Sequence, residues 1–347
     1  MKIVTKSFFR YAFCIYIVLS LSIVSCMKHR ANDRHDGDII EDVSDKVKGF
    51  DSEQFDFHSW ANIQCTGGKI FVTDSQSTDS IIGVFNASDL SFKGLIAKFG
   101  PAPEEISVPG AVRYDQTTGL LSIFDYGQMT IKTYNVDSAL AYKPYYPTTT
   151  GSIPSGRIPD RYVGLNDSVG IARLIKMPNP QSSKRGGYDQ SLCRYNIKTG
   201  EIDEFDTSER QEGLKTLFAI NAPKDRIVEC AINNDLISIY DINGKKIRDI
   251  QGPNYDDSGV VKGVRFFTHV VTSDDYIFAL YSGSDDKATN IFGELIHIYD
   301  ADGNYIKTLD AGTLIGHIAY DDNSNRLIIV CEGSDIQLAY IDLNEVL

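Results

Sequence analysis

The chain is poor in positive charge: 34 Lys and Arg residues stand against 47 Asp and Glu residues, for a formal net charge of −13 over 347 residues. Such an excess of negative charge repels phosphate backbones, which excludes nucleic-acid binding as a function class. The sequence also lacks HExxH, GxSxG and phosphate-loop motifs, which would assign a metalloprotease, a serine hydrolase or a nucleotide-binding enzyme. No motif therefore identifies a reaction.

Long hydrophobic runs are also scarce, and the one at residues 11–24 is too short to cross a membrane comfortably. It follows Lys2, Lys6 and Arg10, a pattern typical of a secretory signal peptide. The run ends in Ile23-Val24-Ser25-Cys26, which resembles the lipobox of bacterial lipoproteins. That resemblance implies removal of residues 1–25 and lipidation of Cys26, where paired acyl chains give a stable anchor. The alternative is an ordinary signal peptide with an incidental cysteine.

The residues after Cys26 indicate in which membrane the protein is anchored and which way it faces. Met27 replaces the Asp that commonly retains lipoproteins in the inner membrane, so the resemblance implies an outer-membrane anchor. Residues 28–30 lack the acidic cluster that some such bacteria use for surface export, which favours an orientation towards the periplasm. Residues 26–37 are polar and without periodicity, so we expect a flexible tether. Loss of the three positive charges in residues 1–25 takes the mature net charge from −13 to −16.

Cysteine is scarce as well, and no two of the six residues form a CxxC pair. Cys230 and Cys331 lie in the apolar runs IVECAI and LIIVCE, where a thiol behaves as a small hydrophobe. We therefore expect no disulfide, no metal site and no cofactor. The four thiols expected to be buried are Cys65, Cys193, Cys230 and Cys331.

The chain does contain a motif that returns six times: an apolar run, an aromatic or aliphatic anchor residue, Asn or Asp, and then a turn. The anchors are 42 to 61 residues apart. This period indicates radially repeated β-sheets, because one short sheet cannot bury its faces without neighbours. The anchors are Phe85, Tyr134, Tyr195, Tyr240, Tyr299 and Ile341.

Each repeat supplies four strand-like runs, which predicts an all-β fold: a six-bladed β-propeller of four-stranded antiparallel blades over residues 38–347. The last repeat has no fourth run, because the chain stops shortly after Ile341. Residues 38–50 alternate apolar and charged side chains, so we expect this segment to become the outer strand of the last blade and to close the ring. The fourth runs are residues 92–99, 142–146, 202–205, 246–250 and 305–309.

The second repeat resembles a known family. It reads Gly100-Pro101-Ala102-Pro103-Glu104-Glu105-Ile106, then Leu121-Ser122-Ile123-Phe124-Asp125, then Ile131 and Tyr134. This pattern is similar to the NHL repeat and to TolB-like six-bladed propellers of bacterial envelope lipoproteins, although Ala102 and Glu104 replace glycines. The resemblance implies a propeller in the cell envelope, and it says little about function because propellers host many activities.

The long connections fall at residues 146–159, 175–190, 207–215, 251–263 and 282–292, between second and third strands or between blades. In a propeller these two kinds of connection emerge on the same face, so we expect a binding site at that mouth of the central channel. Charged and aromatic residues there suit a peptide or a glycan. The candidate ligand-binding residues are Arg157, Arg161, Lys176, Arg185, Tyr188, Tyr255, Asp257, His269, Asp285, Phe292 and His317.

His269 and His317 occupy equivalent positions, four residues before the turn that closes the first strand of the fifth and sixth blades. First strands line the channel, so these imidazoles could face each other and bind a metal or move a proton. Two histidines alone make a poor metal site. The Asp pairs 256–257 and 285–286 could bind calcium, although no spacing matches a calcium loop.

The expected function is that of a lipid-anchored, monomeric binding module without catalysis, which holds an envelope protein or an oligosaccharide on its loop-rich face. The alternative is a hydrolase or lyase that acts on glycan or lactone substrates at the channel mouth. We expect contact with the membrane through the lipid anchor alone.

Overall fold

The repeated Asn or Asp organises the turn after each anchor. In every copy its side-chain oxygen accepts a hydrogen bond from a backbone N–H two or three residues later, which stabilises the turn without help from the rest of the chain. All six anchors are buried, with at most 9% of their surface exposed. The N–H donors belong to Ser88, Ser138, Lys198, Asn243, Asp302 and Asn344.

The computed structural model describes residues 33–34, 39–176, 189–206, 211, 213–285, 292–333 and 335–347. Residues 34–347 form one compact unit. Within the described ranges no helix has the length and apolar character needed to cross a membrane. The expected signal peptide, Cys26 and most of the tether lie outside the described residues.

Three sheets each consist of four antiparallel strands that are consecutive in the sequence. The first contains β4 (Asn62–Thr66), β5 (Lys69–Thr73), β6 (Ser80–Asn86) and β7 (Phe92–Lys98). The second contains β8 (Pro109–Asp115), β9 (Leu120–Asp125), β10 (Thr130–Asn135) and β11 (Thr148–Ser152). The third contains β12 (Arg157–Gly164), β13 (Val169–Lys176), β14 (Asp189–Asn196) and β15 (Ile202–Glu204).

The next sheet includes β16 (Thr216–Asn221), β17 (Arg226–Ala231), β18 (Leu236–Asp241) and β19 (Lys246–Gln251). The last sheet contains β20 (Val264–Thr272), β21 (Tyr276–Asp285), β22 (Gly293–Asp300), β23 (Tyr305–Asp321), β24 (Arg326–Glu332) and β25 (Leu338–Asp342), with β2 (Ile40–Asp42) and β3 (Lys48–Phe50) at its edges. The remaining elements are β1 (Asp33–Arg34), the 3-10 helices η1 (Ser44–Lys46) and η2 (Leu343–Glu345), and the helix α2 (Val136–Ala141).

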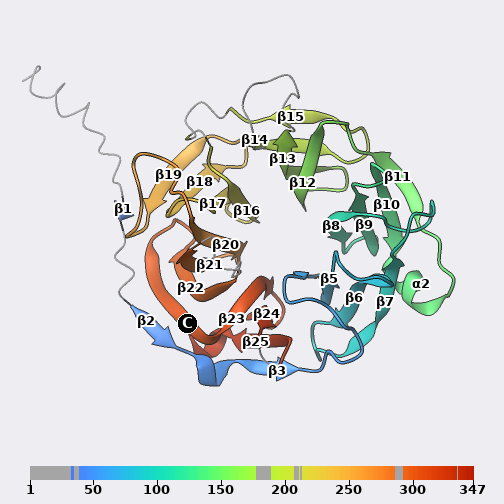
Figure 1. Cartoon of the computed structure of the whole chain (residues 1–347), viewed down its shortest axis with the longest axis horizontal. Coiled ribbons are helices and arrows are strands. Elements are labelled where there is room, and N and C mark those ends of the chain that lie inside the picture. Colours follow the sequence, from blue (N-terminus) through green and yellow to red (C-terminus); the bar gives the residue numbers. More distant parts are fainter. Residues whose placement is uncertain are drawn as a thin grey trace, which may run out of the picture. The chain divides into compact units, whose positions relative to one another are not determined.

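The sheets of residues 34–347 are arranged radially around a common centre, with β8, β12, β16 and β20 nearest to it (Figure 1). Apolar side chains fill the space between neighbouring sheets. One such layer joins Phe71 and Ile82 of the first sheet to Leu121 and Tyr134 of the second. The fold is therefore an all-β propeller of four-stranded antiparallel blades.

The predicted fifth and sixth blades are not separate sheets. Strand β23 runs on for 17 residues: Tyr305–Asp310 pair with β22, and Leu314–Asp321 pair with β24. Gly312 has a φ of 63°, which lets the chain bend at this point, and its N–H donates to Asp310 Oδ1 at 2.9 Å. The two four-stranded groups therefore share one continuous strand where a loop was expected.

The N-terminal segment closes the last sheet, but only in part as predicted. Strand β3 pairs with β25, with Phe50 opposite Leu338, so this part of the prediction is confirmed. Strand β2 pairs instead with β23, in parallel, with Ile40 opposite Thr308. Val43 lies between the two strands and is fully buried in the apolar layer beneath them. This buried residue explains why residues 40–50 extend over both halves of the sheet.

The fourth strand of the second blade was placed wrongly. Residues 142–146 form no strand, and the strand that pairs with β10 is β11. The reason is the short helix α2, which Asn135 caps by accepting the Ser138 N–H at 2.9 Å. Its apolar side, Val136 and Ala139, is buried against the first two sheets. The helix uses the residues that would otherwise have continued directly into the outer strand.

The four cysteines of the propeller form no disulfide, as predicted. Cys193, Cys230 and Cys331 are buried, whereas Cys65 is half-buried. Burial raises the pKa of the Cys193 thiol to about 12 and that of Cys331 to about 11. These two thiols are therefore protonated and unreactive at neutral pH.

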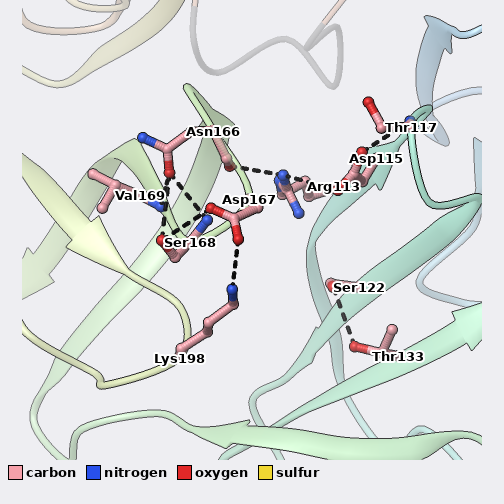
Figure 2. Close-up of polar contacts among 10 residues, drawn as sticks. All are labelled: Arg113, Asp115, Thr117, Ser122, Thr133, Asn166, Asp167, Ser168, Val169 and Lys198. Atoms are coloured by element: carbon pink, nitrogen blue, oxygen red, sulfur yellow. Dashed lines mark hydrogen bonds and ion pairs between the residues drawn. The ribbon is translucent and has the colours of Figure 1, made fainter.

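The turns opposite the long connections make polar contacts both between neighbouring blades and within one blade (Figure 2). Arg113 on β8 donates through Nη2 to the Asn166 carbonyl oxygen at 2.7 Å, and Asn166 belongs to the turn between β12 and β13. Lys198, in the turn between β14 and β15, pairs with Asp167 at 2.7 Å. Both charges of this ion pair are exposed, so it contributes little to stability.

Candidate ligand site at the centre of the ring

Three innermost strands of the blades carry a polar side chain at equivalent positions along the strand. In β12, β20 and β23 the register shifts immediately before Arg161, His269 and His317, respectively. After the shift these residues stand opposite Arg173, Leu280 and Val330, which hold corresponding positions in the second strands of their blades. A bulge re-aims the side chain that follows it, and bulges are common beside functional sites.

The two imidazoles predicted to face each other are in contact. Their ring centroids lie 3.5 Å apart, and the rings are tilted by 40°. His269 is 5% exposed and His317 is 8% exposed. His317 Nδ1 accepts the backbone N–H of Ile63 at 3.2 Å, so the single proton of the neutral ring is on Nε2.

Both imidazoles are neutral at neutral pH. Burial lowers the pKa of His269 well below its usual value, and the nearby His317 and the positive charge of Arg161 lower it further. Burial likewise lowers the pKa of His317, with Arg161 as the second cause. Among the described residues, neither His269 Nδ1 nor His317 Nε2 has a hydrogen-bond partner. A buried polar atom without a partner is costly and calls for an explanation.

Arg161 supplies the positive charge at this level. Desolvation, and then the neighbouring Arg173, lower the pKa of its guanidinium to about 10, so it remains protonated at neutral pH. Arg173 is neutralised by Asp160, with Nε 2.8 Å from Oδ1 and a second contact through Nη2. No salt bridge joins Arg161 to a described residue, but Asp160 also favours its charged form, and its side chain is half-buried. Two guanidinium groups therefore share one carboxylate, which leaves an excess of positive charge at the centre.

Two other predicted residues lie in the same blade but are occupied by an ion-pair network. Arg157 and Lys176 stand opposite each other on β12 and β13, and both pair with Glu204 on β15. Burial opposes ionisation of Glu204, but the hydrogen bonds from Lys176 and Ser191 outweigh it and hold the pKa of this carboxyl below its usual value. Arg157 and Lys176 thus have an internal partner, unlike Arg161.

The structure places the remaining candidates as follows. Tyr255 is half-buried, and its hydroxyl accepts from Gln211 Nε2 at 3.1 Å, whereas Asp257 is exposed. Phe292 is 6% exposed and therefore belongs to the core. Asp285 ends β21, opposite Val264. Arg185 and Tyr188 lie outside the described residues.

An aromatic pair that was not predicted from the sequence lies in the segment that packs against the strand of His317. Trp60 is 41% exposed and stacks on His58, with centroids 5.4 Å apart and planes within 1°. Buried Asp74 orients the His58 ring through a 2.8 Å contact with Nδ1. The segment is next to the site because Ile63, three residues after Trp60, donates to His317. The one available signal was that Trp60 is the single tryptophan of the chain.

No set of three or more His, Cys, Asp and Glu side chains in the described ranges is placed to hold a metal ion. The calcium possibility raised for the Asp pairs 256–257 and 285–286 therefore gains no support from the described residues. Asp256 is engaged locally, since its carboxylate accepts the Ser258 N–H at 2.8 Å.

No protein-family model and no curated protein matches the chain. Solved structures do. A member of the DUF4221 family from Bacteroides vulgatus has 14% identity and a TM-score of 0.55, over 85% of this chain and 94% of that one. Regucalcin from Agrobacterium tumefaciens, a calcium-binding protein, has 9% identity and a TM-score of 0.54, over 87% of this chain and 94% of that one. The WD40 repeats of RRP9 have 10% identity and a TM-score of 0.50, over 81% of this chain and 79% of that one. At these identities the likeness shows that the chain shares the β-propeller fold, and nothing finer.

Proposed function

We propose that the protein is a lipid-anchored binding module of the bacterial envelope, which holds a protein or oligosaccharide ligand at the centre of its ring. The observation that carries the proposal is the convergence of Arg161, His269 and His317, each of which follows a bulge. His269 and His317 each have a buried ring nitrogen that no described residue satisfies, and Arg161 adds positive charge. A ligand would supply the missing partners. These side chains are sufficient to hold a ligand, and the proposal assigns them no catalytic role.

We further infer that the ring has six blades of the TolB-like or NHL-like kind, with the last two sharing β23. Six apolar layers support this count, because each joins one pair of neighbouring four-stranded groups. The layer around Phe85 and Ile328, for example, joins the last group to the first, as a closed ring requires. The other layers lie between successive groups around the ring.

The anchor can be tested separately from the ligand site. With Cys26→Ser we expect no incorporation of radiolabelled palmitate and release of the protein into the soluble periplasmic fraction, because no thiol remains for the diacylglycerol. Wild-type protein should be labelled and should fractionate with outer membranes, and Cys65→Ser serves as the matched control. Equal labelling of wild type and Cys26→Ser would show that Cys26 is not the lipidated residue.

The ligand site is tested by changes that remove its polar atoms. We expect the double variant Arg161→Gln/His317→Gln to lose the ligand-dependent rise in melting temperature that wild type shows with solubilised envelope material, because bound ligand stabilises the folded state by mass action. Differential scanning calorimetry of the mature full-length protein makes the measurement. A variant with an undiminished rise would place the ligand elsewhere.

A second candidate function is a hydrolase or lyase that acts on glycan or lactone substrates. The observation that favours it is the neutral imidazole pair, since an unprotonated ring nitrogen without a partner can serve as a general base at neutral pH. Turnover of lactone or glycan substrates that is abolished by His269→Gln, in a variant that still binds the substrate, would establish this function.

A further inference from the structure

We propose that the site recognises an acidic oligosaccharide, with a uronate carboxylate at Arg161 and His317 and a neighbouring sugar ring on the Trp60–His58 stack. This inference rests on the proposed function and names the ligand class of the same site. It joins two features that the comparisons leave unexplained: an excess of positive charge at the centre and an exposed aromatic pair in the segment that packs against the strand of His317.

The charge at Arg161 selects an anion. The mature protein is strongly acidic, yet this half-buried guanidinium forms no salt bridge with a described residue, while the nearby Asp160 pairs with Arg173. Two guanidinium groups beside one carboxylate leave an excess of positive charge, which a ligand carboxylate would balance. The planar fork of arginine matches the two oxygens of a carboxylate.

The histidines favour the same ligand. Because His317 Nδ1 accepts the Ile63 N–H, its Nε2 bears a proton and is a buried donor with no acceptor. A donor beside a guanidinium complements a carboxylate oxygen, which only accepts. The same arrangement disfavours a cation, since Arg161 already lowers the pKa of both imidazoles. The positive charge of Arg161 and the free donor of His317 therefore both favour a carboxylate ligand.

The aromatic stack distinguishes a saccharide from a simple anion. Trp60 lies against His58, and the Asp74 contact orients that ring, so the stack is already formed without a ligand. The backbone of this segment packs against the strand of His317: a Cβ added to Gly316 would lie 1.9 Å from the Ser59 carbonyl oxygen. Aromatic side chains combined with a few polar groups that fix orientation are the usual lining of a small-molecule site.

The single tryptophan makes the test direct, since all tryptophan fluorescence comes from Trp60. We expect trigalacturonate to change the emission of the mature full-length protein in a saturable titration, and calorimetry to give the same affinity. The carboxyl-reduced trisaccharide, which is neutral, should bind at least about tenfold more weakly. Added salt should weaken trigalacturonate binding, because salt screens the charge.

Variants separate the parts of the proposal. Arg161→Gln should weaken trigalacturonate binding at least about tenfold, and the affinity of Arg161→Lys should lie between those of wild type and Arg161→Gln. Lys198→Gln is the control, because it removes an equal charge from the turns on the opposite face, and it should change the affinity less than about twofold. Trp60→Ala should weaken both trisaccharides in calorimetry. Circular dichroism confirms that each variant is folded.

Three results would overturn the inference: no saturable binding of trigalacturonate, equal affinity for the neutral trisaccharide, or an unchanged affinity in Arg161→Gln. A neutral trisaccharide that binds equally well and still depends on Arg161 or Trp60 would refute the carboxylate while leaving the binding module intact. If envelope material raises the melting temperature of wild type but not of Arg161→Gln/His317→Gln, while trigalacturonate does not bind, the ligand class alone is wrong.

Discussion

Asp125→Ala is expected to lower the free energy of unfolding by about 3–5 kcal/mol. Asp125 is fully buried at the end of β9 and accepts backbone N–H groups of Ser107, Val108 and Gly127 at 3.0–3.1 Å. Its Oδ2 also lies 3.5 Å from the ammonium group of Lys132, which is 1% exposed. Removal of the carboxylate would leave a buried cation without its counter-charge and several backbone donors without an acceptor.

Urea denaturation of the purified protein at neutral pH measures this loss, with Asp137→Ala as the control. Asp137 is 79% exposed and lies 3.5 Å from Lys69, so its loss should cost less than about 0.5 kcal/mol. If Asp125→Ala unfolds at the same urea concentration as Asp137→Ala, the loop before β8 does not depend on this carboxylate.

The same residue predicts an acid dependence. Burial opposes ionisation of Asp125, but the hydrogen bonds from Ser107 and Val108 outweigh it and hold the pKa of the carboxyl below its ordinary value. A carboxyl whose pKa is lower in the folded than in the unfolded state stabilises the protein above the unfolded value, about 3.9, and loses that contribution as the pH falls towards the folded value. The stability difference between wild type and Asp125→Asn should therefore shrink below about pH 4.

Val43→Asp is expected to cost about 4 kcal/mol or more, because it replaces a fully buried side chain with a charge that finds no partner in an apolar layer. Val43 also donates its N–H to the Asp310 carbonyl oxygen at 2.9 Å. Its displacement would detach β2 and β3 together and expose the edge of β25. The variant should unfold at lower urea concentration than wild type and should aggregate more readily.

Ile40→Asp is the matched control, since Ile40 lies in the same segment but is 60% exposed. It should change the free energy of unfolding by less than about 0.5 kcal/mol. Limited proteolysis, followed by mass spectrometry of the fragments, should show early cleavage near residues 40–50 in Val43→Asp alone. Equal protection of both variants would mean that the segment does not hold the ring closed.

Neighbouring residues encode most of the fold, which is why the repeat could be recognised without coordinates. The burial of Tyr195 and Tyr299 follows from their place in apolar runs, and the turn after each follows from the Asn or Asp next in sequence. The misplaced fourth strand of the second blade has an equally local origin. Residues 142–146 have a strand-like composition, but Asn135 starts a helix just before them.

The candidate site could be predicted only in part. Equivalent positions in the repeat indicated that His269 and His317 face each other, and the 3.5 Å between their rings confirms it. The same reasoning gave no way to separate Arg161 from Arg157, because both lie on β12. Only the structure shows that Arg157 is paired with Glu204.

By itself, the sequence determined the strands, the buried anchors and the turns of this protein, because alternating burial and Asx turns depend on residues a few positions apart. Tertiary structure alone decided that β23 is continuous, that residues 40–50 extend over two groups of strands, and that the segment with Trp60 packs against the strand of His317. The contact between Ile63 and His317 joins residues 254 positions apart, and it exists only when the ring is closed. A local pattern cannot encode a contact that depends on closure of the whole ring.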